Sequence, residues 1–369
     1  MLRGNCKVVN PHSEFAASLE IEGEKIKAVT PVEEEARCFV LPGFLDLHVH
    51  GSHGFDFTER ASSGDFAKAV EEVSLRLAEF GVTAFVPTTV TAEHQVLLNA
   101  CKGMREVDQV KGALPLGIHM EGPYINPEAA GAQDAKAIRR PSIPEFQDYW
   151  IASGGRILTM TLAPEVEGGL EFSTHLSNLG VHPSVGHTMA TYDQTLRALI
   201  SGADRGTHVF NAMRPFHHRE PGPSLALLNS NAYIEVIPDL NHLSPHLLTF
   251  LIRNFSHRIV AVTDAIAAVG LGEGSFSLGG ITVKVRQGRA LTAEGRLAGS
   301  VLSMDEALRK IVSLGFTLRD VVRVMSYNPR RYLGIQGGIV RPGAQADLVF
   351  LNRDLEVVEV YIKGRKVKG

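Results

Sequence analysis

The sequence predicts an α/β protein: a (β/α)8, TIM-like barrel that carries a small β-sandwich domain built from both chain termini. Eight strand-like segments alternate with helix-like segments through the middle of the chain, and both ends hold only strand-like segments. Alternation of this kind indicates parallel strands joined by right-handed crossovers. Eight such units over roughly 250 residues are typical of a closed barrel.

The predicted barrel strands are short apolar runs, several of which end in polar residues: 39–50, 84–88, 116–121, 158–162, 182–186, 206–210, 233–237 and 259–263. Helix-like stretches lie between most of them, for example at 67–80, 192–201 and 245–254. We assign the barrel to residues 41–334. A β-hairpin insertion is expected near 275–292, with a helix at 304–314 after it.

The two chain ends have the alternating pattern of half-buried strands. Residues 18–22 and 25–29 alternate around a Gly23-Glu24 turn, and residues 346–351 and 357–362 form a second such pair. A two-stranded hairpin is only marginally stable in water. We therefore expect residues 1–40 and 335–369 to pack together as one small β domain.

Composition excludes several classes of protein. The chain is 44% hydrophobic and 21% charged with a net charge of −3, which does not indicate nucleic acid or a membrane as its partner. No apolar run has membrane-spanning length, and the N-terminus lacks an apolar signal core. Cys6, Cys38 and Cys101 are odd in number and widely spaced, so we expect neither a disulfide framework nor a zinc knuckle, but a cytoplasmic protein.

The first predicted barrel strand ends in His48-Val49-His50. Alternate side chains of a strand point to the same face, so both imidazoles would project side by side. Gly51 follows directly, which places the pair at the C-terminal end of the strand, where barrels of this type hold their active sites. The alternative is that these are ordinary hydrogen-bonded core histidines.

Other strand ends carry the same kinds of residue, namely Glu121, His187, His208 and Asp264. Imidazole and carboxylate together suit Zn2+, Fe2+, Mn2+ or Co2+, and six candidates allow one or two ions per chain. Asp264 is the natural general base. Each residue has a structural alternative, such as a turn for Glu121 or a helix cap for Asp264. Their agreement in position favours the metal site.

The motifs resemble those of the amidohydrolase superfamily, and within it the N-acetylglucosamine-6-phosphate deacetylases. The resemblance covers essentially the whole chain and is carried by PGFLDLHVHG at 42–51, EGPYINP at 121–127, GHT at 186–188, THVFNAM at 207–213, HHREPG at 217–222, VTDA at 262–265 and LAGS at 297–300. The first motif is shared across the superfamily. The combination of the later ones is specific to the deacetylase branch.

The resemblance implies hydrolysis of the acetamide of N-acetylglucosamine 6-phosphate to glucosamine 6-phosphate and acetate, in amino-sugar catabolism and recycling. Glu121, His187 and His208 would hold the ion found in all members, and His48 and His50 a second one. Asp264 would activate water and then protonate the leaving amine. Asn211 and Ala212 would contact the sugar phosphate. Arg219 and His242 would bind its 6-phosphate group. The acetamido group would be contacted by Leu297, Ala298 and Gly299.

The resemblance also implies a homodimer, because the family's phosphate pocket borrows residues from a neighbouring subunit. The chain departs from the family pattern at two further substrate-binding segments. Gln133, after Ala132, stands where many members carry histidine, although it can still donate a hydrogen bond to a carbonyl. Leu240 follows Asp239 where glycine is usual, so the hexosamine preference stays open.

Three alternatives remain. The first is a deacetylase of another hexosamine, such as N-acetylgalactosamine 6-phosphate. The second is a cyclic-amide hydrolase of the same superfamily, which often uses a carboxylated lysine on the fourth strand. Here residues 158–162 lead to Ala163-Pro164-Glu165 with no lysine. The third is a non-catalytic scaffold, which would be expected to lose ligands, whereas all six candidates are present.

Overall fold

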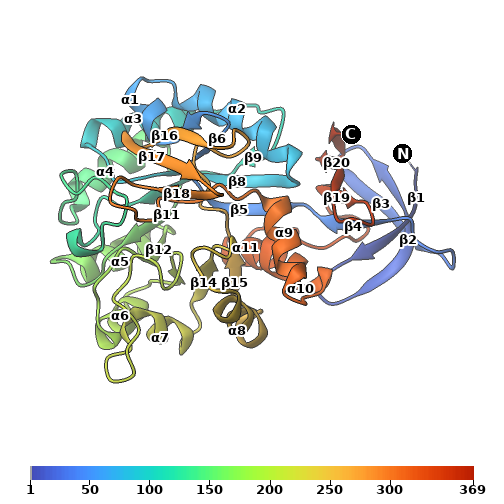
Figure 1. Ribbon diagram of the computed structural model, residues 1–369. Helices are drawn as coiled ribbons and strands as arrows, with labels where there is room; N and C mark the ends of the chain where they lie inside the picture. The colour runs from blue at the N-terminus through green and yellow to red at the C-terminus, as the bar shows by residue number, and fades with distance from the viewer. Residues whose placement is uncertain (1) are drawn as a thin grey trace.

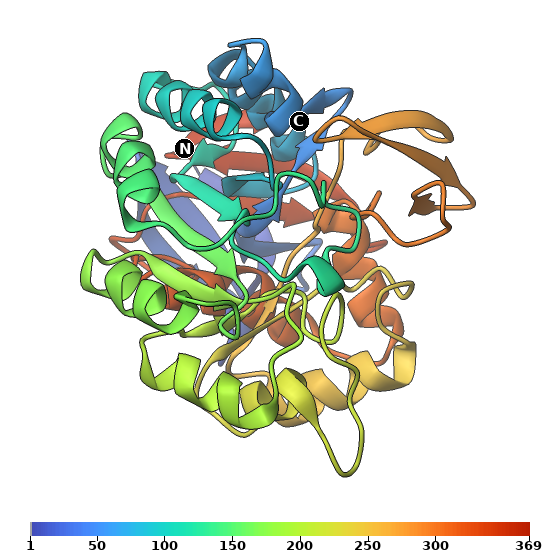
Figure 2. The same ribbon diagram turned by 90° about the vertical axis from the view of Figure 1, so that its left-hand side faces the viewer.

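Eight parallel strands form the predicted barrel in the computed structural model, which describes residues 2–369 (Figures 1 and 2). Neighbouring strands follow the order β5-β8-β10-β11-β12-β13-β14-β15, and the short β9 (Leu114–Pro115) pairs with β8. Their bounds are β5 Phe44–Val49, β8 Val82–Thr89, β10 Ile118–Glu121, β11 Ile157–Leu162, β12 His182–Val185, β13 Arg205–Gly206, β14 Tyr233–Val236 and β15 Ile259–Ala261.

The barrel is closed between its first and last strands. Val49 at the end of β5 forms a parallel bridge with Ala265, just beyond β15. The Asp264 amide donates to the His48 carbonyl over 2.9 Å, and the His50 amide donates to the Ala265 carbonyl over 2.8 Å. Closure therefore brings the first and last predicted active-site segments into direct contact.

Helices connect the strands and cover the outside of the barrel (Figure 1). They are α1 Phe57–Ser62, α2 Phe66–Glu79, α3 His94–Glu106, α4 Ile143–Ala152, α5 Gly169–Asn178, α6 Tyr192–Ile200, α7 Gly222–Leu228, α8 Pro245–Phe255, α9 Met304–Ser313, α10 Leu318–Val322 and α11 Asn328–Tyr332, with a 3-10 turn η1 Pro127–Ala129 and a π-helical turn η2 Arg323–Tyr327. Local sequence explains their starts: Thr191 and Gln194 form a capping box at α6, and Ser244 caps α8 with Pro245 in its first turn.

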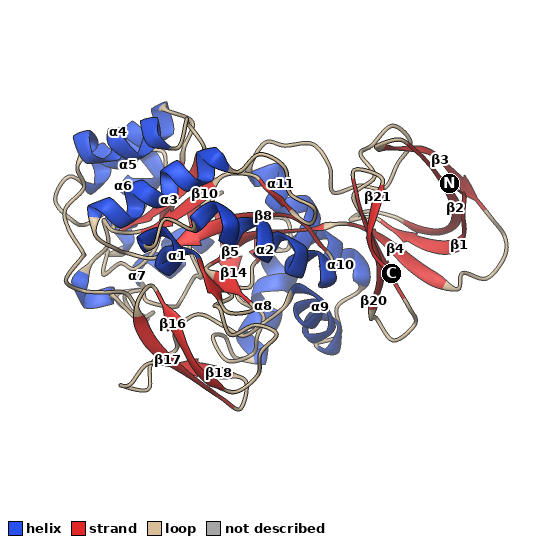
Figure 3. Cartoon of the chain, turned by 90° about the horizontal axis from the view of Figure 1, so that it is seen from above, coloured by secondary structure: helices blue, strands red, loops and turns tan. Residues whose placement is uncertain are grey.

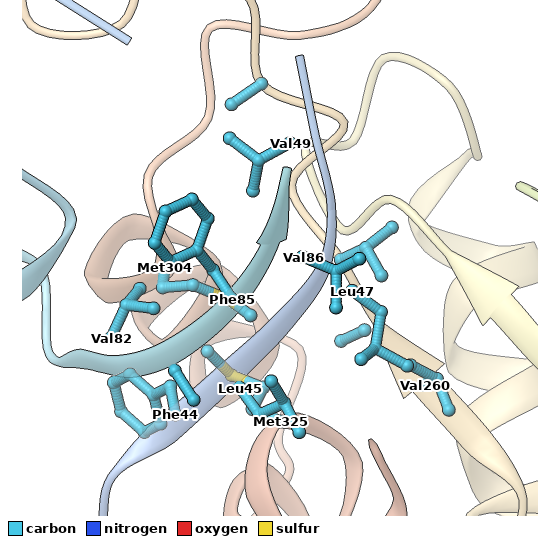
Figure 4. Close-up of a cluster of buried hydrophobic side chains, with 14 of the residues drawn as sticks. Phe44, Leu45, Leu47, Val49, Val82, Phe85, Val86, Val260, Met304 and Met325 are labelled. Atoms are coloured by element: carbon cyan, nitrogen blue, oxygen red, sulfur yellow. The ribbon is translucent and has the colours of Figure 1, made fainter. Parts of the chain in front are cut away.

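Apolar side chains of the strands pack against the elements around them. Phe44, Val82 and Phe85 lie in one buried cluster with Met304 and Met325 (Figure 4). Burial of this kind stabilises the fold by roughly 25 cal/mol for each Å² of apolar surface removed from water.

Inside the barrel, side chains from several strands hydrogen-bond to one another. His119 Nε2 lies 2.8 Å from Thr161 Oγ1, which lies 2.8 Å from Thr207 Oγ1, and Ser184 Oγ is 2.6 Å from Thr207 Oγ1. Such barrels are usually filled by Val, Ile and Leu. The active-site end of this barrel therefore rests on a hydrogen-bonded layer.

Both chain ends contribute to one seven-stranded sheet at the end of the molecule away from the insertion (Figure 3). Its order is β21-β20-β19-β4-β1-β2-β3, with β1 Leu2–Val9, β2 Glu14–Glu22, β3 Lys25–Pro31, β4 Cys38–Pro42, β19 Leu348–Leu351, β20 Val357–Ile362 and β21 Arg365–Lys368. A bridge between Lys25 and Gln345 curls the sheet over its own core, which contains Leu19, Val40 and Tyr361. The predicted association of the two ends is confirmed.

The single strand predicted over 39–50 is wrong in one respect, because the chain divides there into β4 of the terminal sheet and β5 of the barrel. The break falls at Gly43, whose amide donates to the Asp347 carbonyl over 2.9 Å. A Cβ at this position would lie 2.1 Å from the Thr83 side chain. The sequence pattern did not show the break because both strands are apolar.

The cysteine prediction, which excluded a disulfide framework, did not anticipate that one pair is bonded. Cys6 and Cys38 are joined by a disulfide, with their Cα atoms 4.7 Å apart. They are partners in register on the parallel strands β1 and β4. This pairing depends on the sheet order, which their separation of 32 residues does not reveal. Cys101 is free and buried.

The insertion after β15 has three strands, one more than the predicted hairpin: β16 Gly274–Leu278, β17 Ile281–Arg286 and β18 Arg289–Leu291. Gly279 and Gly280 have φ values of 57° and 91°, and Gln287 and Gly288 have 50° and 69°. Positive φ at both central residues makes tight hairpin turns. The insertion extends beside the barrel (Figure 3).

None of the helices in residues 2–369 has the length and apolar character that crossing a bilayer requires.

Candidate active site

Glu121, the last residue of β10, lies at the centre of the site. Its Oε1 is 3.2 Å from His187 Nε2 and 2.9 Å from His208 Nε2. All three side chains are buried. These three residues form one group whose ligand atoms are close enough to share a metal ion.

His48 and His50 approach the same glutamate from the end of β5 and just beyond it. His50 Nε2 lies 3.4 Å from Glu121 Oε2, His48 Nε2 lies 3.6 Å from Glu121 Oε1, and the two Nε2 atoms are 3.0 Å apart. With Glu121 they form a second group able to hold a metal ion. Because Glu121 belongs to both groups, it is placed to bridge two ions.

Asp264 completes the arrangement from just beyond β15. Its Oδ1 lies 3.1 Å from His50 Nε2 and 3.3 Å from His48 Nε2. Asp264, His187 and His208 have φ values of 51°, 48° and 28°, in the left-handed region that non-glycine residues rarely adopt. Strained backbone of this kind clusters at functional sites.

The donor set fits a divalent metal. His48 Nδ1 lies 2.8 Å from Glu235 Oε1, His187 Nδ1 lies 2.8 Å from the Ala129 carbonyl, and His50 Nδ1 lies 3.3 Å from the Thr88 carbonyl. These oxygens only accept hydrogen bonds, so each Nδ1 carries the hydrogen and each Nε2 presents a lone pair to the site. Metal-binding histidines are usually held in this way.

The charges of the two central carboxylates reflect the surrounding histidines. Burial opposes ionisation of Glu121, but His187 and His48 hold its pKa well below the usual range. Burial also acts against Asp264, whose pKa is nevertheless lowered by His48 and His50. His119 differs from the six, because burial and His48 hold its pKa well below the usual value and its ring bonds barrel threonines.

Most of the predicted substrate-binding residues line a cavity of about 270 Å³ that opens onto His50, Glu121, His187, His208 and Asp264. These residues are Ala132, Gln133, Asn211 and Ala212 on one set of loops, and His242, Leu297 and Gly299 on another. The sequence analysis missed four further lining residues, Val90, Gly131, Leu278 and Arg296. Leu278 comes from β16, so the three-stranded insertion forms part of the wall.

Gln133 is bound directly to the central glutamate. Its Nε2 donates to Glu121 Oε2 over 2.7 Å, and its Oε1 accepts from the Thr91 amide over 2.6 Å. The backbone of Leu240 has a φ of 64°, so the chain follows the path that glycine adopts with least strain.

Three predicted substrate-binding residues do not line the cavity. Asp239 supports His242 instead, since its Oδ2 lies 2.8 Å from His242 Nδ1. Ala298 is fully buried beneath the wall. Arg219 is exposed in the loop before α7, which extends away from the barrel (Figures 1 and 2).

Sequence reasoning also missed the residues that support His48. Glu235 in β14 and Arg205 in β13 are fully buried and form an ion pair, with Arg205 Nη1 3.2 Å from Glu235 Oε2. The one signal available was Glu235, a charged residue inside the apolar segment 233–237, whereas Arg205 precedes the predicted strand 206–210.

This fold and this set of buried ligands are those of a metal-dependent hydrolase built on a barrel. Residues 39–367 match the Amidohydrolase family, and the chain belongs to it. It is 37% identical to N-acetylglucosamine-6-phosphate deacetylase of Bacillus subtilis over 90% of this chain and 85% of that protein. It is 35% identical to N-acetylgalactosamine-6-phosphate deacetylase of Escherichia coli O157:H7 over 92% of this chain and 89% of that protein.

Solved structures agree with this assignment. An aspartate-to-alanine mutant of N-acetyl-D-glucosamine-6-phosphate deacetylase from Mycobacterium smegmatis, in complex with N-acetyl-D-glucosamine-6-phosphate, matches with a TM-score of 0.92 at 34% identity, over 100% of this chain and 99% of that one. The predicted family and barrel fold are thus confirmed.

Proposed function

We propose that this chain hydrolyses the acetamide of N-acetylglucosamine 6-phosphate, giving glucosamine 6-phosphate and acetate. The observation that carries the proposal is Glu121, which lies between two pairs of histidines on the wall of a cavity of about 270 Å³. The sugar phosphate is supported by relatives of that activity that match about nine-tenths of the chain.

Glu121, His187 and His208 would hold one divalent ion, and His48, His50 and Asp264 would contribute to a second. Zn2+ is our first choice, and Fe2+, Mn2+ and Co2+ suit the same donors. A divalent ion bound there supplies a Lewis acid for the amide carbonyl and lowers the pKa of water.

Asp264 is proposed as the general base and acid. Its carboxylate accepts a proton from the attacking water as the water oxygen bonds to the acetamide carbon. The same proton then passes to the sugar nitrogen as the carbon–nitrogen bond breaks, which leaves acetic acid and the free amine. The acid then gives up its remaining proton, so the products at neutral pH are acetate and the ammonium form of the amino sugar. A carboxylate within hydrogen-bond reach of both positions is the requirement for this role.

The cavity walls are assigned to the rest of the substrate. Leu297 and Gly299 would contact the acetamido end, and Gly299 has no side chain to obstruct it. Asn211 and Ala212 would contact the sugar phosphate, and His242 the 6-phosphate. The Gln133 amide, 2.7 Å from Glu121, is placed to donate to the carbonyl of the substrate.

We propose that Arg219 serves the cavity of a second subunit in a homodimer. It lies outside the cavity of its own chain, on an exposed loop that also exposes 52% of Phe216. Arginine suits phosphate through its bidentate geometry. Mixing an Arg219→Ala protein with an Asp264→Asn protein tests this arrangement, because mixed dimers would regain one complete site. Failure of the mixture to regain activity after subunit exchange would contradict it.

The experiment that tests the activity is acetate release from a panel of N-acetylated sugars, with and without 6-phosphate, alongside metal analysis. We expect N-acetylglucosamine 6-phosphate to be the best substrate. N-acetylgalactosamine 6-phosphate is the second candidate, because one relative at 35% identity carries that activity. No acetate from any member after metal reconstitution would refute the proposal.

We also propose a cytoplasmic location, because sugar phosphates are charged and stay in the compartment where they are made. Disulfides are rare in reducing cytoplasm. Thiol titration of protein purified under alkylating conditions tests this proposal. Three thiols would mean that Cys6 and Cys38 are reduced in the cell and would support a cytoplasmic location. One thiol would mean that the Cys6–Cys38 disulfide persists and would count against it.

A further inference from the structure

Glu235 is a buried carboxylate that the proposed reaction does not use. It lies within β14 between Ile234 and Val236, and its side chain is fully buried inside the barrel. An ionised carboxylate in such a place is costly unless it is paired and hydrogen-bonded. Three polar contacts account for its presence.

One oxygen of Glu235 contacts two of the candidate metal ligands. Its Oε1 accepts from His48 Nδ1 over 2.8 Å and from the backbone amide of His208 over 3.1 Å. His48 belongs to the second group of ligands and His208 to the first. A single carboxylate oxygen therefore contacts one residue of each ligand group.

The positive charge of Arg205 neutralises the other carboxylate oxygen of Glu235, Oε2. Arg205 Nη1 lies 3.2 Å from Glu235 Oε2, and the guanidinium also donates to Ser184 Oγ and Thr159 Oγ1, each over 3.2 Å. The ring of Tyr332 lies against the same guanidinium, with 5.1 Å between the ring centroid and Cζ. The cation is thus held in place, and Glu235 can stay ionised while it faces His48.

We propose that Glu235 is a positioning residue that holds His48 ready for a divalent ion and selectively strengthens the ion site of His48 and His50. Because Oε1 only accepts, His48 keeps its hydrogen on Nδ1 and presents the Nε2 lone pair to the site. A carboxylate behind an imidazole also makes it a stronger ligand.

Among the four candidate ligand histidines, His48 is the one whose Nδ1 faces a carboxylate. His50 and His187 bond to the backbone carbonyls of Thr88 and Ala129, which are neutral. In Glu235→Gln the side chain loses its charge but keeps an oxygen that can accept from the His208 amide. The change therefore weakens one ion site and leaves the site of Glu121, His187 and His208 in place.

The test counts ions and does not depend on the substrate, so it stands apart from the deacetylase assay even though it rests on the proposed metal centre. Metal-free wild-type and Glu235→Gln proteins are dialysed against graded Zn2+, and bound zinc is measured per folded chain. We expect the first ion to bind normally and the second to bind about 10- to 100-fold more weakly in the variant. In a His48→Ala background, Glu235→Gln should cause no further loss.

Glu145→Gln is the matched control. Glu145 is also paired with an arginine, Arg139, over 2.8 Å. Its side chain also contacts the hydroxyls of Tyr124 and Tyr149, and none of these residues is a candidate ligand. It should lower stability without changing zinc binding. If Glu235→Gln does not fold, because Arg205 is left unpaired, the double variant Arg205→Met with Glu235→Gln replaces it.

Three results would overturn the proposal. One is a second zinc ion bound by the variant as tightly as by the wild type. Another is equal weakening of both ions, which would mean a general structural role. The third is a wild-type protein that binds only one ion at saturating Zn2+. Each of these leaves the acetate-release result unaffected.

Discussion

Replacement of Gly299 by alanine should damage catalysis through the backbone of Asp264. Gly299 has a φ of 60°, and a Cβ there would lie 2.8 Å from the Asp264 carbonyl oxygen and 2.6 Å from Ile266 Cγ2. That carbonyl also accepts a hydrogen bond from the Ser300 amide over 2.7 Å. The new methyl group must push against a carbonyl that is already held.

The size of the effect follows from these contacts. Ordinary contact begins at 3.4 Å, so the carbonyl at 2.8 Å must move by about 0.6 Å. A misplacement of about 1 Å at an active site costs up to about 100-fold in rate, so we expect kcat to fall by roughly 10- to 100-fold. Left-handed strain of about 1–2 kcal/mol and overpacking of about 1–3 kcal/mol should lower the free energy of unfolding.

Gly295→Ala is the matched control. Gly295 lies four residues earlier with a φ of 79°, and a Cβ there would meet no atom within 4 Å. This variant has the left-handed strain alone, so it should lose about 1–2 kcal/mol of stability and keep normal kcat. The difference between the two variants isolates the contact with Asp264.

Urea unfolding measures the stability of both variants, and acetate release from N-acetylglucosamine 6-phosphate measures their kcat. Zinc content is measured in parallel, to show that any loss of rate is not a loss of metal. If Gly299→Ala matched Gly295→Ala in kcat, the argument that Gly299 positions Asp264 by close packing would be refuted.

Three further predictions concern the same site. Asp264→Asn should keep the zinc held by Glu121, His187 and His208 and lose about 10²- to 10⁴-fold in kcat, the usual contribution of a general base. Retention of most activity would show that Asp264 is not the general base. Arg219→Ala should lower kcat/KM for the phosphorylated substrate by roughly 10- to 150-fold, the equivalent of about 1.5–3 kcal/mol for a charged hydrogen bond, with little change for the unphosphorylated sugar; an equal loss on both would contradict it. Chelation should abolish acetate release and lower the unfolding temperature, with both restored by Zn2+, because an ion that binds only the folded chain stabilises it; full activity in a metal-free protein would contradict this.

Patterns local in sequence predicted the fold well. Strand–helix alternation predicted the barrel, because each β-α unit is recognisable within about thirty residues of chain. The alternation of side chains along a strand predicted that His48 and His50 point to the same side, and their Nε2 atoms are 3.0 Å apart. Glu121 could be chosen because it ends a predicted strand, and strand ends meet at one face of a barrel.

Features that depend on packing between distant segments could not be predicted in this way. The Cys6–Cys38 disulfide requires β1 to lie beside β4, which the sheet order decides. Glu235 supports His48 across 187 residues of sequence. Arg296 was missed because it is a single exposed arginine in a polar turn, and only the folded loop brings it to the cavity.

The order of strands in the terminal sheet has a consequence for how the protein is synthesised. β4 pairs with β1 on one side and with β19 on the other, and β19 begins only at Leu348. At about 5–20 residues per second, the ribosome needs roughly 15–60 s between these two strands. During that time β4 presents an unpaired edge, which is a site for aggregation. Completion of this sheet therefore waits for the last part of the chain, after the barrel strands have emerged.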